Sequence, residues 1–185
     1  MYDYRYRFSG YLLVIMAIAI VCNIYILIPL YTLIANDWNV LVSQTVLGSS
    51  VFSFFYAFGL LTFGALSEKF GRKNILTYGM LGSALFTLLV AFSFDLFTLY
   101  LFRALQGFIL GSFAPVAFSY CFDHFKETKR TLIIALINMG FLVSGVVGPL
   151  ISGYVSSIWH WQASFSFFAL LYSLLFILAL IFLLP

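Results

Sequence analysis

Residues 64–73 read Gly64-Ala65-Leu66-Ser67-Glu68-Lys69-Phe70-Gly71-Arg72-Lys73. Its polar part, from Glu68 to Lys73, separates two apolar stretches, 43–66 and 74–94, and each is long enough to cross a bilayer as a helix. Gly71 permits a tight turn at low steric cost, and Gly64 allows two helices to approach closely at the membrane edge. The stretch therefore has the character of a short loop between two membrane-spanning helices.

The rest of the chain repeats this pattern. It is 64% hydrophobic and 8% charged, whereas a soluble domain is roughly half apolar and a quarter charged. Backbone groups have no water partner in lipid, so apolar spans of this length must be helices. We predict an all-α polytopic membrane protein, one domain over 1–185, in the cell (plasma or inner) membrane. The six expected spans are 10–33, 43–66, 74–94, 96–121, 131–155 and 162–184.

Lysine and arginine gather in three of the connecting segments. Eight of the nine basic residues lie before the first span, after the second or after the fourth: Arg5, Arg7, Lys69, Arg72, Lys73, Lys126, Lys129 and Arg130. Because basic loops stay in the cytoplasm, we predict that both termini are cytoplasmic. Trp38, Trp159 and Trp161 are expected at the opposite membrane boundary. The net charge of +3 shows no basic stripe, so nucleic acid is not an expected partner.

Two prolines stand at matching depths in the two halves of the chain. Pro29 is about the twentieth residue of the first span, and Pro115 is about the twentieth of the fourth. Such a match is typical of a 3+3 inverted repeat, whose interrupted helices line a substrate site. Coincidence is the alternative, because four prolines can align by chance.

The loop at 64–73 resembles the signature loop of the major facilitator superfamily, G-x-L-[SA]-D-[RK]-x-G-R-[RK], with Glu68 in place of the usual aspartate. The resemblance implies a conformational latch that holds the outward-facing state through charge contacts. It assigns that role to Gly64, Glu68, Lys69, Gly71, Arg72 and Lys73. Arg72 can grip a carboxylate with two parallel hydrogen bonds, and Asp123 and Glu127 are possible partners. The alternative is that these charges only set topology.

The fourth span carries Arg103 followed by Gln106 and Gly107, similar to a second motif of the superfamily. Arg103 is the only basic residue outside the cytoplasmic groups, and a charge inside a span usually faces a cavity. The resemblance implies substrate binding and proton coupling for Arg103. The alternative is that Arg103 snorkels to the outer headgroups.

The fifth span looks like the superfamily's antiporter motif, G-x-x-x-G-P-x-x-G-G, and so favours efflux over uptake. Gly148, Pro149 and Gly153 match it, while Ser144 and Ser152 replace glycines. Close helix packing is the plainer reading of the same small residues.

Asn23 stands where many multidrug members have an acidic residue, and no Asp or Glu lies deep in any of the six spans. Proton coupling is therefore implied by the resemblance alone. With Arg103 and Asn23, the polar side chains of Gln106 and Asn138 complete the predicted substrate cavity. Gln106 and Asn138 could bind substrate or simply join helices.

The resemblance covers the first half of a twelve-helix transporter, whose alternating access needs a second bundle. We predict the N-terminal half of a secondary active transporter that exports a small hydrophobic drug or metabolite in exchange for protons. Its partners are the bilayer, that substrate, protons and a second six-helix half. An uptake transporter or a truncated, non-transporting membrane subunit is the alternative. We expect no enzyme, cofactor or metal, because the sequence has no nucleophile–base pair, phosphate loop or metal cluster.

Overall fold

The computed structural model describes residues 2–184, and the side chains of all of these except residues 2–5 and 7. Within that range every regular element is a helix. Six helical stretches are long and apolar enough to cross a membrane, as predicted. In chain order the elements are α1 (Tyr2–Tyr25), the 3-10 turn η1 (Ile28–Leu30), α2 (Tyr31–Trp38), α3 (Val42–Phe70), α4 (Arg72–Ala91), α5 (Leu96–Leu110), α6 (Phe113–His124), α7 (Glu127–Ile158) and α8 (Gln162–Phe182).

The first and fourth spans, expected at 10–33 and 96–121, are present, and each is interrupted as the inverted-repeat reading of Pro29 and Pro115 allows. α1 ends at Tyr25, four residues before Pro29, and α5 ends at Leu110, five residues before Pro115. A proline has no N–H to donate to the carbonyl four residues earlier, and its ring crowds that carbonyl. The two helices therefore end within one residue of the same place relative to the proline that follows.

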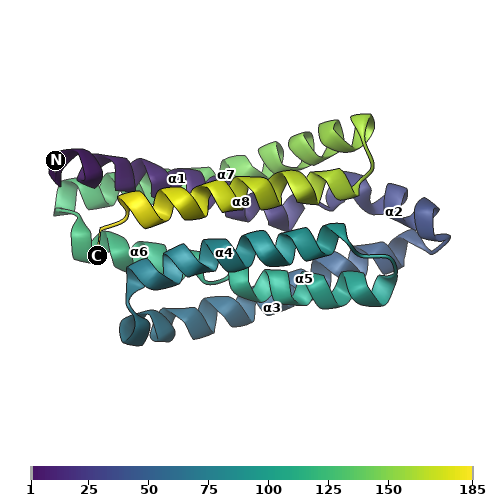
Figure 1. Ribbon diagram of the computed structural model, residues 1–185, viewed down its shortest axis with the longest axis horizontal. Helices are drawn as coiled ribbons and strands as arrows, with labels where there is room; N and C mark the ends of the chain where they lie inside the picture. Colours follow the sequence, from purple (N-terminus) through teal and green to yellow (C-terminus); the bar gives the residue numbers. More distant parts are fainter. Residues whose placement is uncertain (1, 185) are drawn as a thin grey trace.

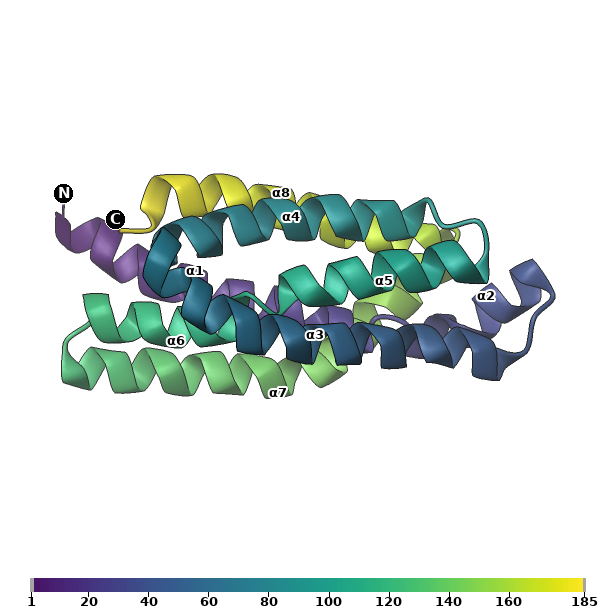
Figure 2. The same cartoon turned by 90° about the horizontal axis from the view of Figure 1, so that it is seen from below.

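The spans pair across the two halves of the chain. α1 packs along α7, α3 along α5 and α4 along α8, and Figures 1 and 2 show these helices running nearly parallel to the long axis of the bundle. In span numbers the pairs are 1 with 5, 2 with 4, and 3 with 6. An inverted repeat exchanges span 1 with 4, 2 with 5 and 3 with 6. That exchange turns the pair 1–5 into the pair 4–2 and leaves the pair 3–6 unchanged. This is the pairing that an inverted repeat requires.

Both termini lie at one end of the bundle, together with the α3–α4 and α6–α7 turns that carry the basic residues (Figure 1). The predicted segregation of cations to one end is confirmed for the described side chains. Arg5 and Arg7 lie outside the described side chains, and the cytoplasmic orientation stays a prediction.

The opposite end is closed by tryptophan packing. Trp161 is 2% exposed, stands edge-on to Trp38 with ring centroids 5.5 Å apart, and donates from Nε1 to Asp37 at 2.9 Å. Trp161 therefore lies at the expected end of the bundle but is buried there, because its indole N–H finds a partner inside the bundle. Asn39 ends α2 in the left-handed region with φ 53°, a conformation that asparagine tolerates well.

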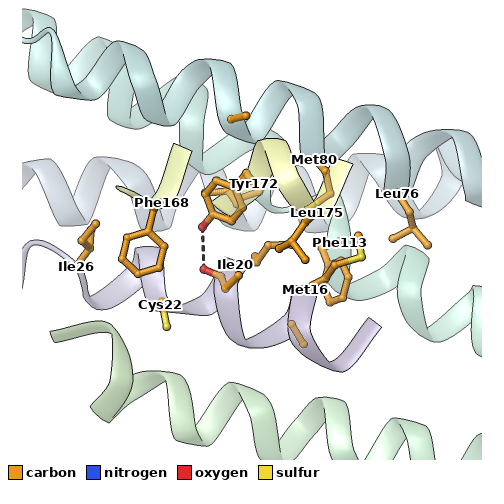
Figure 3. Packing of buried hydrophobic residues seen from close by; sticks show 14 of the residues in the cluster. Met16, Ile20, Cys22, Ile26, Leu76, Met80, Phe113, Phe168, Tyr172 and Leu175 are labelled. Atoms are coloured by element: carbon orange, nitrogen blue, oxygen red, sulfur yellow. Dashed lines mark hydrogen bonds between the residues drawn. The ribbon is translucent and has the colours of Figure 1, made fainter. Parts of the chain in front are cut away.

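α8 fills the space between α1 and α4. Figure 3 shows its inward side chains Phe168, Tyr172 and Leu175 among Met16, Ile20 and Met80. Both cysteines, Cys22 and Cys121, are buried and form no disulfide with each other.

Candidate functional site at the interrupted first span

A cluster of fully buried polar side chains lies beside the break in the first span. Its centre is Arg103 on α5, whose Nη1 and Nη2 donate to the backbone carbonyl of Asn23 at 3.3 and 3.2 Å. That carbonyl belongs to the last turn of α1, where carbonyls lack the normal partner four residues on. A cation at a helix C-terminus also interacts favourably with the helix dipole. Arg103 therefore caps the broken end of α1.

The cluster continues through side-chain amides and hydroxyls. Gln106 accepts from Arg103 Nη1 at 2.7 Å and donates from Nε2 to Asn23 Oδ1 and Thr87 Oγ1, both at 2.8 Å. Asn23 Nδ2 donates to the Tyr172 hydroxyl, which donates in turn to the Ala19 carbonyl at 2.7 Å. We call the five side chains the central polar cluster: Asn23, Thr87, Arg103, Gln106 and Tyr172. They join α1, α4, α5 and α8.

The central polar cluster is completely buried, because each of its five residues is 0% exposed. The guanidinium of Arg103 lies over the ring of Phe52 on α3, with Cζ 4.1 Å from the ring centroid. This geometry excludes the alternative in which Arg103 snorkels to the outer headgroups. Among the described residues its Nε has no hydrogen-bond partner.

Asn138 is separate from this cluster. Its side chain is exposed on α7 and donates to the Ile134 carbonyl at 3.0 Å. Of the four predicted cavity residues, the structure thus brings together Asn23, Arg103 and Gln106 and leaves Asn138 on an outer face. For Gln106 the helix-joining reading is the one that its contacts describe.

At the basic end of the bundle, Arg72 pairs with Asp123. Arg72 Nη1 lies 2.6 Å from Asp123 Oδ2 and also donates to the Ser119 carbonyl. The expected carboxylate partner for Arg72 is confirmed as Asp123. The pair ties the start of α4 to α6, which belongs to the other half of the repeat.

The remaining latch residues have different surroundings. Gly71 joins α3 to α4 with φ 87°, in the region where glycine carries no side-chain clash. Glu68 and Lys69 are exposed, and Lys73 is half-buried. Gly64 makes only an ordinary contact, since an added Cβ would lie 3.7 Å from Pro115. The close approach expected at Gly64 occurs instead further along α3, where that helix crosses α5.

That close approach is made by glycines of α3 and α5. A Cβ on Gly107 would meet the Phe52 carbonyl oxygen, and one on Gly111 would lie 2.8 Å from the Cα of Gly59. Small residues at such crossings allow backbones to touch. The sequence drew attention to Gly107 but gave no sign of its partner.

The antiporter-like segment of α7 packs on the first span. A Cβ on Gly148 would lie 2.8 Å from the Cys22 carbonyl oxygen, and Gly153 faces Pro29. Ser144 Oγ donates to the Ile18 carbonyl at 2.9 Å. Pro149 lies inside the α7 helix. These small residues let α7 follow α1 across its break.

Three residues of the site were missed by sequence reasoning: Thr87, Tyr172 and Phe52. Phenylalanine, threonine and tyrosine are common in the apolar spans of this chain, and no spacing pattern links these three residues to Arg103. The available signal was the general rule that a buried guanidinium must be surrounded by acceptors and π faces.

Comparison with known proteins identifies the family. The family model of the Major Facilitator Superfamily matches residues 13–185, almost the whole chain. The chain belongs to this superfamily. The superfamily consists of membrane transporters, and the six apolar helices make this chain a multi-pass membrane protein.

Relatives of the chain include drug-resistance proteins. Multidrug resistance protein D of Escherichia coli (strain K12) is 31% identical over 148 residues, which cover 79% of this chain and 37% of that protein. The class H tetracycline resistance protein of Pasteurella multocida is 38% identical over 119 residues, covering 64% of this chain and 29% of that one. The chain thus spans well under half the length of these relatives.

Solved structures support the same fold. A bacterial homolog of the human lysosomal transporter Spinster, in an inward-facing and unoccupied conformation, has a TM-score of 0.85 and 16% identity. The match covers 97% of this chain and 43% of that one. The chain therefore has the architecture of a six-helix superfamily half-bundle.

Proposed function

We propose that this chain forms the N-terminal half of a proton-coupled efflux transporter for a small hydrophobic molecule. The observation that carries the proposal is the pair of matched helix breaks, one of which is capped by Arg103. Interrupted helices in corresponding positions of two repeats are where transporters of this kind bind substrate. The drug-resistance proteins among its relatives support export as the direction.

In this proposal the central polar cluster makes the half-bundle move as one body. Hydrogen bonds from Arg103 and Gln106 tie the broken first span to the third and fourth spans, and Asn23 itself donates to Tyr172 of the sixth span. Alternating access by rocking requires rigid halves around a fixed site. Asn23, Arg103 and Gln106 thus act in coupling by holding the break, and exposed Asn138 offers an amide to the substrate.

A second six-helix half would cover faces that this chain leaves open. Spans two and five are the least buried, and large apolar side chains such as Leu61 (79%) and Leu142 (80%) point outward from them. Lipid or another bundle must cover such faces. Because no Asp or Glu lies deep in the six spans, we assign the proton-carrying group to that second half.

The test is dye efflux from cells that express this chain with and without a matching C-terminal half. We expect export only when both halves are present, and we expect a protonophore to abolish it. Dye accumulation in place of export would favour an uptake transporter. No flux in either case, with the protein folded and inserted, would favour a non-transporting subunit.

The orientation is tested by labelling with a membrane-impermeant maleimide in intact cells. A cysteine at Lys69 should stay unlabelled, and one at exposed Trp159 should react. The buried native cysteines, Cys22 and Cys121, should give little background. Labelling at position 69 would show that the topology is the reverse of the predicted one.

A further inference from the structure

A groove between the first turns of α1 and α7 opens at the basic end of the bundle. It encloses a cavity of about 310 Å³, near the lower end of the range of about 300–1,000 Å³ typical of small-molecule sites. Tyr6 and Tyr11 line it from α1, and Lys129, Leu132 and Leu136 line it from α7. Lys129 is the one charged residue among its described lining residues.

The rim of the groove is polar and its geometry is fixed. Lys129 Nζ lies 5.0 Å from the centroid of the Tyr6 ring, which itself packs on Phe125 at 4.9 Å. The Tyr6 hydroxyl accepts a hydrogen bond from the Lys126 backbone N–H at 3.1 Å. A phenol oxygen can accept one hydrogen bond while its O–H donates another, so the Lys129 ammonium and the Tyr6 hydroxyl can both donate to an anion at the rim.

Below the rim the groove is apolar. Leu136 follows Lys129 by seven residues, which is about 10 Å along a helix. Tyr11 is 60% and Leu132 is 59% exposed, so the lower part is open along the side of the bundle. The groove therefore offers a cationic head site and an apolar channel running along the expected membrane normal.

The groove faces away from the surface that we assign to the substrate and the second half. Leu136 and Asn138 are two residues apart, so their side chains point about 200° apart around α7. With Asn138 toward the second half, Leu136 and the groove face lipid.

We propose that this groove binds an anionic phospholipid of the cytoplasmic leaflet. The phosphate accepts from Lys129 and the Tyr6 hydroxyl, and the upper part of one acyl chain lies against Leu132 and Leu136. Charge complementarity selects this occupant, because basic pockets between helices at the cytoplasmic side suit anionic headgroups. The inference goes beyond transport; it rests on the predicted orientation of the basic end and on the position that the proposed function gives to the second half.

The experiment compares lipids added to the purified chain in detergent. Dioleoylphosphatidylglycerol should raise the Tm more than dioleoylphosphatidylcholine, and native mass spectrometry should retain it preferentially. Lys129→Gln should weaken phosphatidylglycerol binding about fivefold. Lys126→Gln is the matched control, since it removes an equal charge from the same turn at a residue outside the groove lining; its effect should be less than twofold.

A second pair of variants tests the apolar channel. Leu136→Trp should reduce lipid retention, whereas Leu142→Trp, on an exposed part of α7 outside the groove, should leave it unchanged. Equal losses from Lys126→Gln and Lys129→Gln, or equal effects of the two lipids, would overturn the proposal. Stabilisation by glycerol phosphate as large as that by phosphatidylglycerol would overturn the lipid assignment. Because binding is measured rather than flux, the result is independent of whether the chain transports.

Discussion

Arg103 and Asn23 are 80 positions apart, and the Arg103 guanidinium caps the end of the helix that carries Asn23. Two guanidinium nitrogens lie 3.2 and 3.3 Å from the carbonyl oxygen of Asn23. The contact satisfies a last-turn carbonyl at the break before Pro29. It also gives the buried cation a partner in the absence of a carboxylate at that site. The break in the first span and the arginine of the fourth are therefore one structural feature.

Arg103→Lys should destabilise the half-bundle. A lysine ammonium lacks the planar fork that reaches Asn23 and Gln106 together, so at least one buried acceptor loses its charged partner. We expect a loss of about 2–3 kcal/mol, typical of hydrogen bonds to charged groups. Thermal unfolding in detergent measures it, with Arg130→Lys as the control. Equal Tm values for the two variants would show that the cap contributes little.

Arg72→Gln should slow transport more than it lowers stability. The side chains of Arg72 and Asp123 are 23% and 47% exposed, and a partly exposed ion pair contributes roughly 0–1 kcal/mol. Asp123→Asn should have the same effect, and the double variant should be no worse than either single one. Lys126→Gln, an exposed residue outside the latch, is the control for loss of charge. An equal fall of transport and membrane insertion would refute the latch role.

Gly107→Ala should disrupt the α3–α5 crossing. The added methyl would meet the Phe52 carbonyl, and backbone cannot move aside as a flexible side chain can. We expect a cost of about 1–3 kcal/mol, as for other overpacked sites. Gly64→Ala is the matched control, because its Cβ would sit 3.7 Å from Pro115 and be tolerated. Size-exclusion profiles and Tm report both variants, and similar behaviour would contradict the crossing geometry.

Asp95 should make stability depend on acid pH. Its side chain caps α5 by accepting from the Thr98 N–H at 2.8 Å and from the Thr98 hydroxyl at 2.6 Å. These bonds lower the pKa of Asp95 below its ordinary 3.8. The folded carboxyl thus binds its proton less readily than the unfolded one, so its stabilisation is full above about pH 5 and is lost as pH falls through the lowered pKa.

Asp95→Asn isolates that effect, since asparagine also caps helices but does not titrate. The amount by which the wild-type Tm exceeds that of Asp95→Asn should shrink as the pH drops below 4. A constant difference across this range would show that the carboxylate form of the cap is unimportant.

Much of the architecture was predictable because it depends on local chemistry. Runs of apolar residues as long as the bilayer is thick must become helices. The N-terminal segment and the two basic turns are expected at one end, because an even number of membrane crossings separates them. The prolines at 29 and 115 also indicated matched positions. The residues at which α1 and α5 end were not predicted, since a proline inside a membrane helix can be tolerated when neighbours satisfy the freed carbonyl.

The candidate site was only partly predictable. Arg103 stood out because a charge within an apolar span needs an explanation. Tyr172 did not, because a tyrosine among phenylalanines and leucines reads as packing until its hydroxyl is placed beside Asn23. From the sequence, Asn138 and Gln106 were equally good candidates for the substrate cavity. The rotation of α7 about its axis places Asn138 on an outer face.

The sequence by itself determined which segments enter the membrane, which turns share an end and which family the chain resembles. These follow from hydrophobicity, charge and short motifs, all of which act within a few residues along the chain. Only the tertiary structure decided that Arg103 caps α1, that Asp123 receives Arg72 and that Lys129 stands at the mouth of a groove. Such partners are chosen by the angle and register at which helices pack, and no local pattern contains that information.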